Sequence, residues 1–179
     1  MSYDPDKHHR RSIRLKRYDY ASVGAYFVTL NVQNRLQLFG RIAHGKMQLS
    51  RRGEIAASCW EQIPSHFAGV ELDAYVIMPD HMHGLLWIVC PSPIIQPEAF
   101  GKPVAHSLPT IIRSYKSAVT REINLQQPLP NSKKIWQRNY YEDIPRDQGH
   151  IENIRAYIRN NPLKWMIKRK LSVAGADED

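Results

Sequence analysis

Apolar residues form four continuous or alternating runs, each rich in β-branched and aromatic side chains, which is typical of β-strands. These runs predict strands at 25–33, 69–78, 81–90 and 134–144. Pro79 ends the second strand, and Asp80 lies in the tight connection to the third. Between the first two strands, the segments LFGRI, HGK and MQLS predict a short hairpin.

Three further stretches carry apolar residues at helical spacing. They predict helices over residues 50–66, 107–124 and 146–161. Ser50 is a candidate N-cap of the first helix, and the second helix has the most regular amphipathic pattern. Pro162 disfavours helical geometry at the residue before it, so the third helix is expected to end at Asn161.

With the hairpin set aside, the elements follow the order β, α, β, β, α, β, α. The first six form the βαββαβ pattern of a ferredoxin-like sandwich, an α+β fold in which two helices cover one face of the sheet. The seventh is an added C-terminal helix, and the other face of the sheet is left for this helix or for a ligand. The sequence predicts one domain over 21–166, with a basic arm at 1–20, an internal flexible linker at 91–106 and a disordered polar tail at 167–179.

The chain of 179 residues carries a net charge of +8 and has an isoelectric point near 9.6. This excess of positive charge favours an anionic partner, with nucleic acid as the first expectation and an anionic membrane surface as the second. The N-terminus lacks the apolar core of a signal peptide, and no apolar run is long enough to span a bilayer, so a cytoplasmic location is expected. Cys59 and Cys90 lack the spacing of a zinc finger or a disulfide scaffold and are expected to be buried small hydrophobic residues.

Two histidines, His81 and His83, lie in a run that otherwise has the composition of a sheet interior. Residues i and i+2 of a strand point to the same side, about 7 Å apart, so the two imidazoles could offer nitrogens to one metal ion. The alternative is that each histidine forms structural hydrogen bonds near a strand end. A metal site also needs at least one more protein donor.

The last predicted helix carries candidates for that donor. Ile151, Ile154 and Ile158 form its packing stripe, and Tyr157 and Asn161 lie beside the stripe, about 40° from each other around the helix axis. Taken alone, Tyr157 could be a half-buried tyrosine with its hydroxyl in water, and Asn161 could be a C-cap. Their presence together with the histidine strand favours a shared site.

Four stretches in this order resemble the HUH single-tyrosine transposases: VIMPDHMHG, SYKSAVTREIN, IWQRNYYEDI and IRAYIRNNPLKW. The closest branch is that of the REP-associated tyrosine transposases, and the resemblance runs from about residue 10 to residue 166. It implies a ferredoxin-like catalytic domain that acts on single-stranded or hairpin DNA, such as REP-like palindromes. It also implies that His81, His83 and Asn161 are metal ligands and that Tyr157 is the nucleophile.

The resemblance further implies a divalent cofactor, Mg²⁺ or Mn²⁺, and no nucleotide cofactor. The tyrosine would attack a DNA phosphate and form a 5′-phosphotyrosine and a free 3′-hydroxyl, so that strands are nicked and later rejoined. The protein is expected to associate with the nucleoid, and a monomer is slightly favoured over a homodimer. Basic side chains on the arm, the second helix and the last strand are expected to contact DNA phosphates in a salt-sensitive manner. They are Arg10, Arg11, Arg14, Lys16, Arg17, Arg113, Lys116, Arg121 and Arg138.

Three other functions fit parts of the sequence. A protein that has lost catalysis could still bind a DNA hairpin and act in regulation or chromosome organisation. An RNA-binding ferredoxin-like domain would need solvent-facing aromatic residues on the two central strands, where this chain has histidines and aliphatic residues. A metal hydrolase that uses water as its nucleophile would not need Tyr157.

Overall fold

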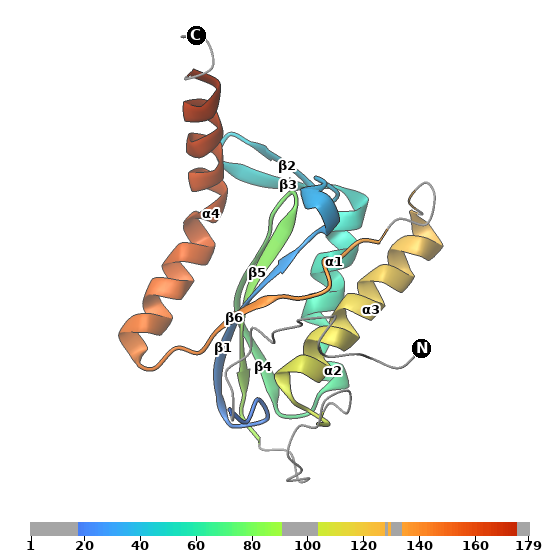
Figure 1. The fold of residues 1–179 in the computed structure, drawn as a ribbon, viewed down its shortest axis with the longest axis vertical. Coiled ribbons are helices and arrows are strands. Elements are labelled where there is room, and N and C mark those ends of the chain that lie inside the picture. The colour runs from blue at the N-terminus through green and yellow to red at the C-terminus, as the bar shows by residue number, and fades with distance from the viewer. Residues whose placement is uncertain (1–17, 91–103, 128, 130–133, 175–179) are drawn as a thin grey trace, which may run out of the picture.

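A four-stranded antiparallel sheet forms the centre of the molecule (Figure 1). The computed structural model describes residues 18–90, 104–127, 129 and 134–174, and of 169–174 it describes the backbone only. The strands lie in the order β4-β5-β1-β6. Their bounds are Gly24–Asn31 for β1, Val70–Ile77 for β4, His81–Ile88 for β5 and Tyr141–Asp143 for β6. This order, with β1 and β5 in the centre, confirms the ferredoxin-like arrangement.

Helices cover both faces of this sheet (Figure 1). Helices α1 (Arg51–Glu61), α2 (Ile63–His66) and α3 (Leu108–Gln126) lie on one face, and α4 (Gln148–Ala174) lies on the other. The predicted hairpin is present as β2 (Gly40–Ala43) and β3 (Lys46–Leu49), and a 3₁₀ turn, η1 (Gln33–Arg35), follows β1. No helix among the described residues is long and apolar enough to cross a membrane.

Alternation along β5 divides its side chains between two hydrophobic clusters. Met82 and Leu86 belong to the larger cluster, which α1 and α3 complete. Leu85 belongs to the smaller cluster, where it packs with Ile154 and Ile158 of α4. Because side chains alternate along a strand, His81 and His83 share the face of Leu85. The histidines therefore point toward α4.

Gly84 is required by the packing on the opposite face of the same strand. A β carbon at this position would lie 2.3 Å from Cζ2 and 2.6 Å from Cη2 of Trp60. Trp60 is fully buried in α1. The glycine that follows the histidines therefore lets this indole lie flat against the sheet.

The last helix differs from its prediction, because α4 continues through Pro162 to Ala174 instead of ending at Asn161. An internal proline removes one backbone hydrogen bond and costs about 3 kcal/mol. Packing beyond the proline offsets this cost: a β carbon at Gly45, in the β2–β3 turn, would lie 3.4 Å from Leu163 and 4.0 Å from Met166. Residues 167–174, predicted to be disordered tail, are the last turns of this helix, and 175–179 lie outside the described residues.

Four smaller predictions also change. The strand predicted over 134–144 is reduced to β6 and an isolated bridge between Trp136 and Val32. The helix predicted over 50–66 is split into α1 and α2 at Gln62, ahead of Pro64. The prediction that both cysteines are buried is wrong for Cys90, which is exposed, whereas Cys59 is half-buried. Of the predicted linker over 91–106, residues 91–103 lie outside the described residues, as do residues 1–17 of the arm.

Substitution of Gly84 by alanine tests the packing of Trp60. We expect Gly84→Ala to lower the free energy of unfolding by roughly 1–3 kcal/mol, because the new methyl group overlaps the indole. Urea unfolding followed by circular dichroism measures the change. In a Trp60→Phe background, which lacks the two contacting ring atoms, the same substitution should cost much less. Equal costs in the two backgrounds would show that Trp60 does not explain this glycine.

Candidate active site

The two histidines are positioned by the tight connection between β4 and β5. The backbone N–H of Met78 donates to the carbonyl oxygen of His81 at 2.8 Å, which closes the turn around Pro79 and Asp80. Register with β1 places Asn31 opposite His81 and Thr29 opposite His83. The site therefore lies at the end of the two central strands, on the face covered by α4.

The imidazole rings face each other through their Nε2 atoms, which are 3.1 Å apart. Each Nδ1 atom has its own partner on the outer side: Asp80 Oδ1 lies 2.5 Å from Nδ1 of His81, and Thr29 Oγ1 lies 2.8 Å from Nδ1 of His83. A carboxylate only accepts hydrogen bonds, so His81 donates to Asp80 through Nδ1.

Both histidines are buried, and burial governs the charge of His83. Desolvation lowers the pKa of His83 to about 3, and electrostatic interactions with His81 and Arg35 act in the same direction. His83 is therefore neutral at physiological pH, which is the protonation state that a metal-binding imidazole requires.

The arrangement fits a metal ion held between the two Nε2 atoms. The two Nε2 atoms converge and are 3.1 Å apart, so both residues could be ligands of one metal ion. The carboxylate of Asp80 behind His81 matches the outer partners that fix metal-binding histidines. In the described part of the chain, no group of three His, Cys, Asp or Glu side chains could hold a metal ion, so a third protein donor of another type is needed.

Tyr157 approaches the histidines from α4. Its hydroxyl lies 3.3 Å from Nε2 of His83, although the two residues are 74 positions apart in the chain. The ring meets those of His83 and Phe27 edge to face, with centroids 5.0 and 6.0 Å away. The Lys164 ammonium lies 5.5 Å from the Tyr157 ring centroid. Tyr157 itself is 39% exposed. The phenol is thus held in place and open to a ligand from solvent.

Asn161 is buried in α4, one turn after Tyr157. One turn further on, the Trp165 ring lies 5.6 Å from that of His81. Residues four apart on a helix are neighbours on one side, so Asn161 lies between two residues that each contact a histidine. Its position suits the predicted role as a ligand, which remains a prediction.

Comparison with known proteins gives two relatives from Haemophilus influenzae (strain ATCC 51907 / DSM 11121 / KW20 / Rd), and no family model matches the chain. An uncharacterized protein is 39% identical over 171 residues, which cover 91% of this chain and 93% of the relative. A candidate REP-associated tyrosine transposase is 27% identical over 148 residues, which cover 83% of this chain and 75% of the relative. The chain belongs to the same family as the first of these proteins.

A solved structure shares the fold. It is the REP-associated tyrosine transposase bound to a REP hairpin, with a TM-score of 0.58, 20% identity, and coverage of 87% of this chain and 74% of that one. The chain is therefore similar in sequence to a REP-associated tyrosine transposase and shares the fold of another. The resemblance found in the motifs is confirmed, and so is the fold class.

Those predicted DNA-contacting residues that the structure describes are not gathered at the histidines. Arg113 and Arg121 are exposed on α3, which covers the opposite face of the sheet, and Arg138 is exposed before β6. Lys116 differs, because its ammonium donates to the backbone carbonyl oxygens of Gln137 and Arg138 at 2.5 and 3.2 Å. The predicted residues of the arm, Arg10, Arg11, Arg14, Lys16 and Arg17, lie outside the described residues.

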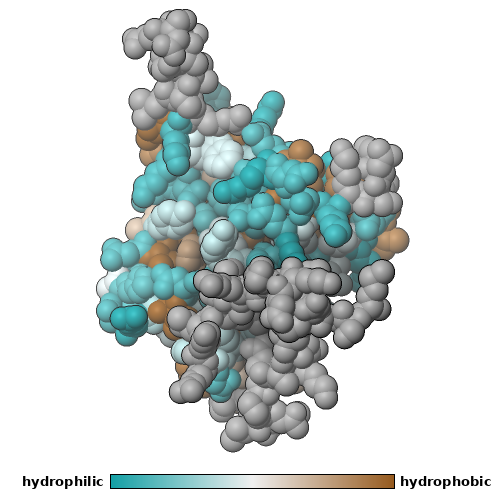
Figure 2. All heavy atoms as spheres, in the orientation of Figure 1, coloured by the Kyte–Doolittle hydropathy of each residue, from teal (hydrophilic) through white to brown (hydrophobic). Residues whose placement is uncertain are grey.

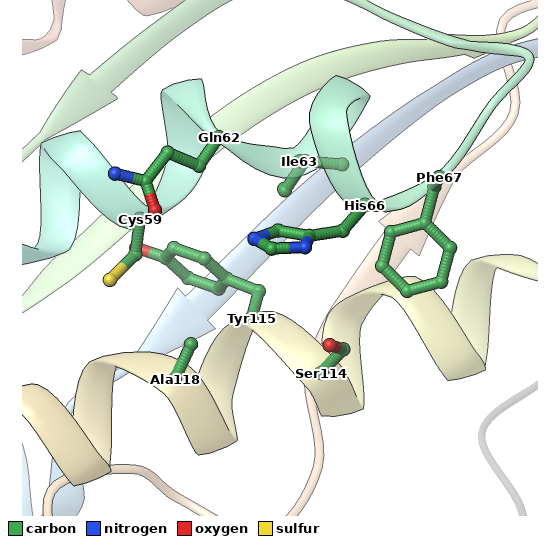
Figure 3. Close-up of a pocket in the computed structure, with 8 residues that line it drawn as sticks. All are labelled: Cys59, Gln62, Ile63, His66, Phe67, Ser114, Tyr115 and Ala118. Carbon is green, nitrogen blue, oxygen red and sulfur yellow. The ribbon is translucent and has the colours of Figure 1, made fainter.

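A small pocket lies on the far side of the sheet from the histidines, between α1–α2 and α3 (Figure 3). It is lined by Cys59, Gln62, Ile63, His66, Phe67, Ser114, Tyr115 and Ala118. Tyr115 donates its hydroxyl hydrogen to the carbonyl oxygen of Ala56 at 3.1 Å, so its polar group is used within the core. On the face seen in Figure 2, hydrophilic residues predominate and hydrophobic ones lie in separate patches.

The helix that carries Tyr157 is joined to the sheet by an ion pair that the sequence did not predict. Arg155 donates from Nε and Nη2 to both carboxylate oxygens of Asp73, at distances of 2.6–3.2 Å. The indole N–H of Trp87 donates to the same carboxylate at 3.0 Å. The bonds from Arg155 and then Trp87 hold the pKa of Asp73 below its ordinary value, against a smaller opposing effect of burial. The pair fixes α4 two residues before Tyr157.

Neutralising Asp73 tests this anchor. We expect Asp73→Asn to lower the melting temperature at neutral pH by roughly 2–4 °C, as a loss of about 1 kcal/mol does in a domain of this size. A carboxyl with a lowered folded pKa stabilises the fold above its unfolded pKa and loses this effect as pH falls through the folded pKa. The difference between wild type and variant should therefore be complete at neutral pH and vanish in acid.

Thermal unfolding at several pH values measures this difference. Glu54→Gln, which removes an exposed pair with Arg51, serves as the control and should shift the melting temperature by less than about 1 °C. A constant difference between Asp73→Asn and wild type down to acid pH would contradict the assignment.

Proposed function

We propose that the protein is a transposase-type enzyme that cleaves and rejoins single-stranded or hairpin DNA with Tyr157 as its nucleophile. Its similarity to REP-associated tyrosine transposases supports a transposase-like protein that binds hairpin DNA. The observation that carries the catalytic part is the position of the Tyr157 hydroxyl, 3.3 Å from a buried, neutral histidine of the β5 pair. A half-exposed phenol beside two convergent imidazole nitrogens is the arrangement that nucleophilic attack on a phosphate requires.

The reaction conserves the number of phosphoester bonds. The Tyr157 oxygen attacks phosphorus, the bond from phosphorus to the 3′ oxygen of DNA breaks, and the released 3′ oxygen takes up a proton as the phenol loses one. The product is a 5′-phosphotyrosine, whose bond retains the reactivity of the original linkage. A later 3′-hydroxyl can reverse the step and join strands, so no nucleotide cofactor is needed.

The residues that would hold a divalent metal are His81, His83 and Asn161. A bound Mg²⁺ or Mn²⁺ would polarise the scissile phosphate and neutralise the charge that develops on it. The chain's own contribution is to keep His83 neutral and to orient both imidazoles. Asp80 holds the ring of His81, and Thr29 holds the ring of His83.

Metal binding can be tested without DNA. We expect wild-type protein to bind Mn²⁺ in isothermal titration calorimetry, and His81→Ala and His83→Ala to abolish measurable binding, because each removes one of two nitrogen donors. Thr29→Val should weaken binding by roughly tenfold, since it removes a partner that orients His83. His66→Ala, an exposed histidine on α2, is the matched control. Unchanged affinity in both β5 variants would exclude this metal site.

Covalent capture of DNA tests the nucleophile. We expect wild-type protein, mixed with a labelled hairpin oligonucleotide bearing a single-stranded flank and Mn²⁺, to give a protein–DNA adduct on a denaturing gel. Tyr157→Phe should abolish the adduct because it removes the attacking oxygen. A chelator should lower the adduct yield by about tenfold or more, because it removes the metal ion that stabilises the charge on the phosphate. Tyr75→Phe provides a matched control, because Tyr75 lies beside Trp60 on the opposite face of the sheet.

The outcomes separate this function from its alternatives. An adduct that survives Tyr157→Phe would overturn the assignment of the nucleophile. Cleavage without an adduct would favour a hydrolase that uses water. Tight hairpin binding without cleavage would favour a protein that binds DNA without catalysis.

A further inference from the structure

The chain leaves β1 through two residues in the left-handed backbone region. Asn34 has a φ of 54° and Arg35 a φ of 53°, within and at the end of η1. Asparagine tolerates this conformation better than most residues, whereas arginine is strained in it and glycine would not be. Strained backbone of this kind is concentrated at functional sites.

The strained turn lies against the histidine site. The backbone N–H of Val32 donates to the carbonyl oxygen of Asp80 at 2.9 Å, and the N–H of Arg35 donates to that of Val32 at 3.1 Å. From this turn the Arg35 side chain reaches back: its Nη1 donates to Oδ1 of Asn31 at 2.9 Å and lies 3.6 Å from Oδ1 of Asp80. The latter oxygen is the one that accepts from His81. A guanidinium thus stands directly beside the buried imidazoles.

The Arg35 side chain is 55% exposed, and within the described residues both of its polar contacts are made by Nη1. The edge formed by Nε and Nη2 is therefore available to a ligand. Two parallel N–H groups at this edge match two oxygens of one phosphate, an arrangement that lysine cannot reproduce.

Stabilisation of the fold does not account for this arginine. Asp80 is already held by His81, and the 3.6 Å separation from Arg35 is longer than a hydrogen bond. A long, half-exposed ion pair adds little stability. The bond to Asn31 could be made by water, whereas the left-handed backbone at Arg35 is a strain that glycine would relieve.

We propose that Arg35 binds the DNA phosphate that Tyr157 attacks, with its Nε–Nη2 edge on the two non-bridging oxygens. This inference rests on the proposed function and adds a residue to it. The guanidinium neutralises the charge that accumulates on those oxygens as the Tyr157 oxygen bonds to phosphorus and the 3′ oxygen leaves. It stands beside the histidines, while Tyr157 approaches from α4, so the phosphate would lie between residues of the strands and of the helix.

The test compares the stability and the chemistry of one variant, Arg35→Gly. We expect its melting temperature to equal or exceed that of wild type, because the strain is removed. The rate of adduct formation in a single turnover should fall by about 100-fold or more, as on loss of one stabilising donor at a reacting centre. Hairpin affinity should change by no more than a few-fold, since one phosphate contact among several is lost. Arg35→Lys should recover only part of the rate.

Arg41→Ala is the matched control, because Arg41 is exposed on the neighbouring β2 strand and donates to Gln48. It should form the adduct at the wild-type rate. A second readout uses DNA with an uncharged methylphosphonate at the phosphate that wild-type protein links to Tyr157. With less negative charge to neutralise, the rates of wild type and Arg35→Gly should converge to within about tenfold.

The outcomes distinguish this inference from the function on which it rests. Absence of any wild-type adduct overturns both. A wild-type adduct that Arg35→Gly forms at an undiminished rate overturns the role of Arg35 alone. A marked fall in melting temperature of Arg35→Gly, with no convergence on the methylphosphonate DNA, identifies Arg35 as a structural residue and likewise overturns the inference.

Discussion

The packing of α4 on the sheet is the constraint on which the site depends. Tyr157 and His83 are 74 positions apart in the chain, and they meet because α4 lies across β4 and β5. Ile151, Ile154 and Ile158 are buried in that contact, and each fully buried isoleucine contributes roughly 1.5–3 kcal/mol. The apolar stripe stabilises the contact between α4 and the sheet, while the ion pair between Asp73 and Arg155 fixes the position of the helix along the sheet.

This contact also decides between two uses of the sheet face. An RNA-binding ferredoxin-like domain leaves its central strands open so that bases can stack on them. Here Ala25 of β1 and Leu85 of β5 are buried beneath α4. A nucleic acid therefore cannot lie across the middle of this face and must approach at its end, where the helix presents an exposed Tyr157 beside the imidazoles.

Local rules predicted the parts of the site that lie on single elements. The period of a strand placed His81 and His83 on one side, and helical spacing placed Tyr157 and Asn161 beside the apolar stripe. The prediction failed where a contact between residues distant in sequence overrides a local rule. Pro162 ends a helix in isolation, but here the hairpin at Gly45 packs on the turns that follow it. The Asp73–Arg155 pair joins residues 82 apart in sequence, and no local pattern marks either residue.

Arg35 is the residue of the site that local sequence patterns predict least. Its role depends on a left-handed backbone, and the residues around it follow no turn motif that predicts one. The outer partners of the histidines are easier to predict. Asp80 immediately precedes His81 in the sequence, and Thr29 can be identified once the register of β1 against β5 is known. Arg35, in contrast, is brought to the histidines by the pairing of Asn31 with His81 and by the hydrogen bond from Val32 to Asp80. The same turn that binds the backbone carbonyl oxygen of Asp80 thus also places the Arg35 guanidinium 3.6 Å from the carboxylate behind His81. Two buried imidazoles and a strained arginine are each unfavourable for folding alone, and one bound phosphate with its metal ion would make use of all three.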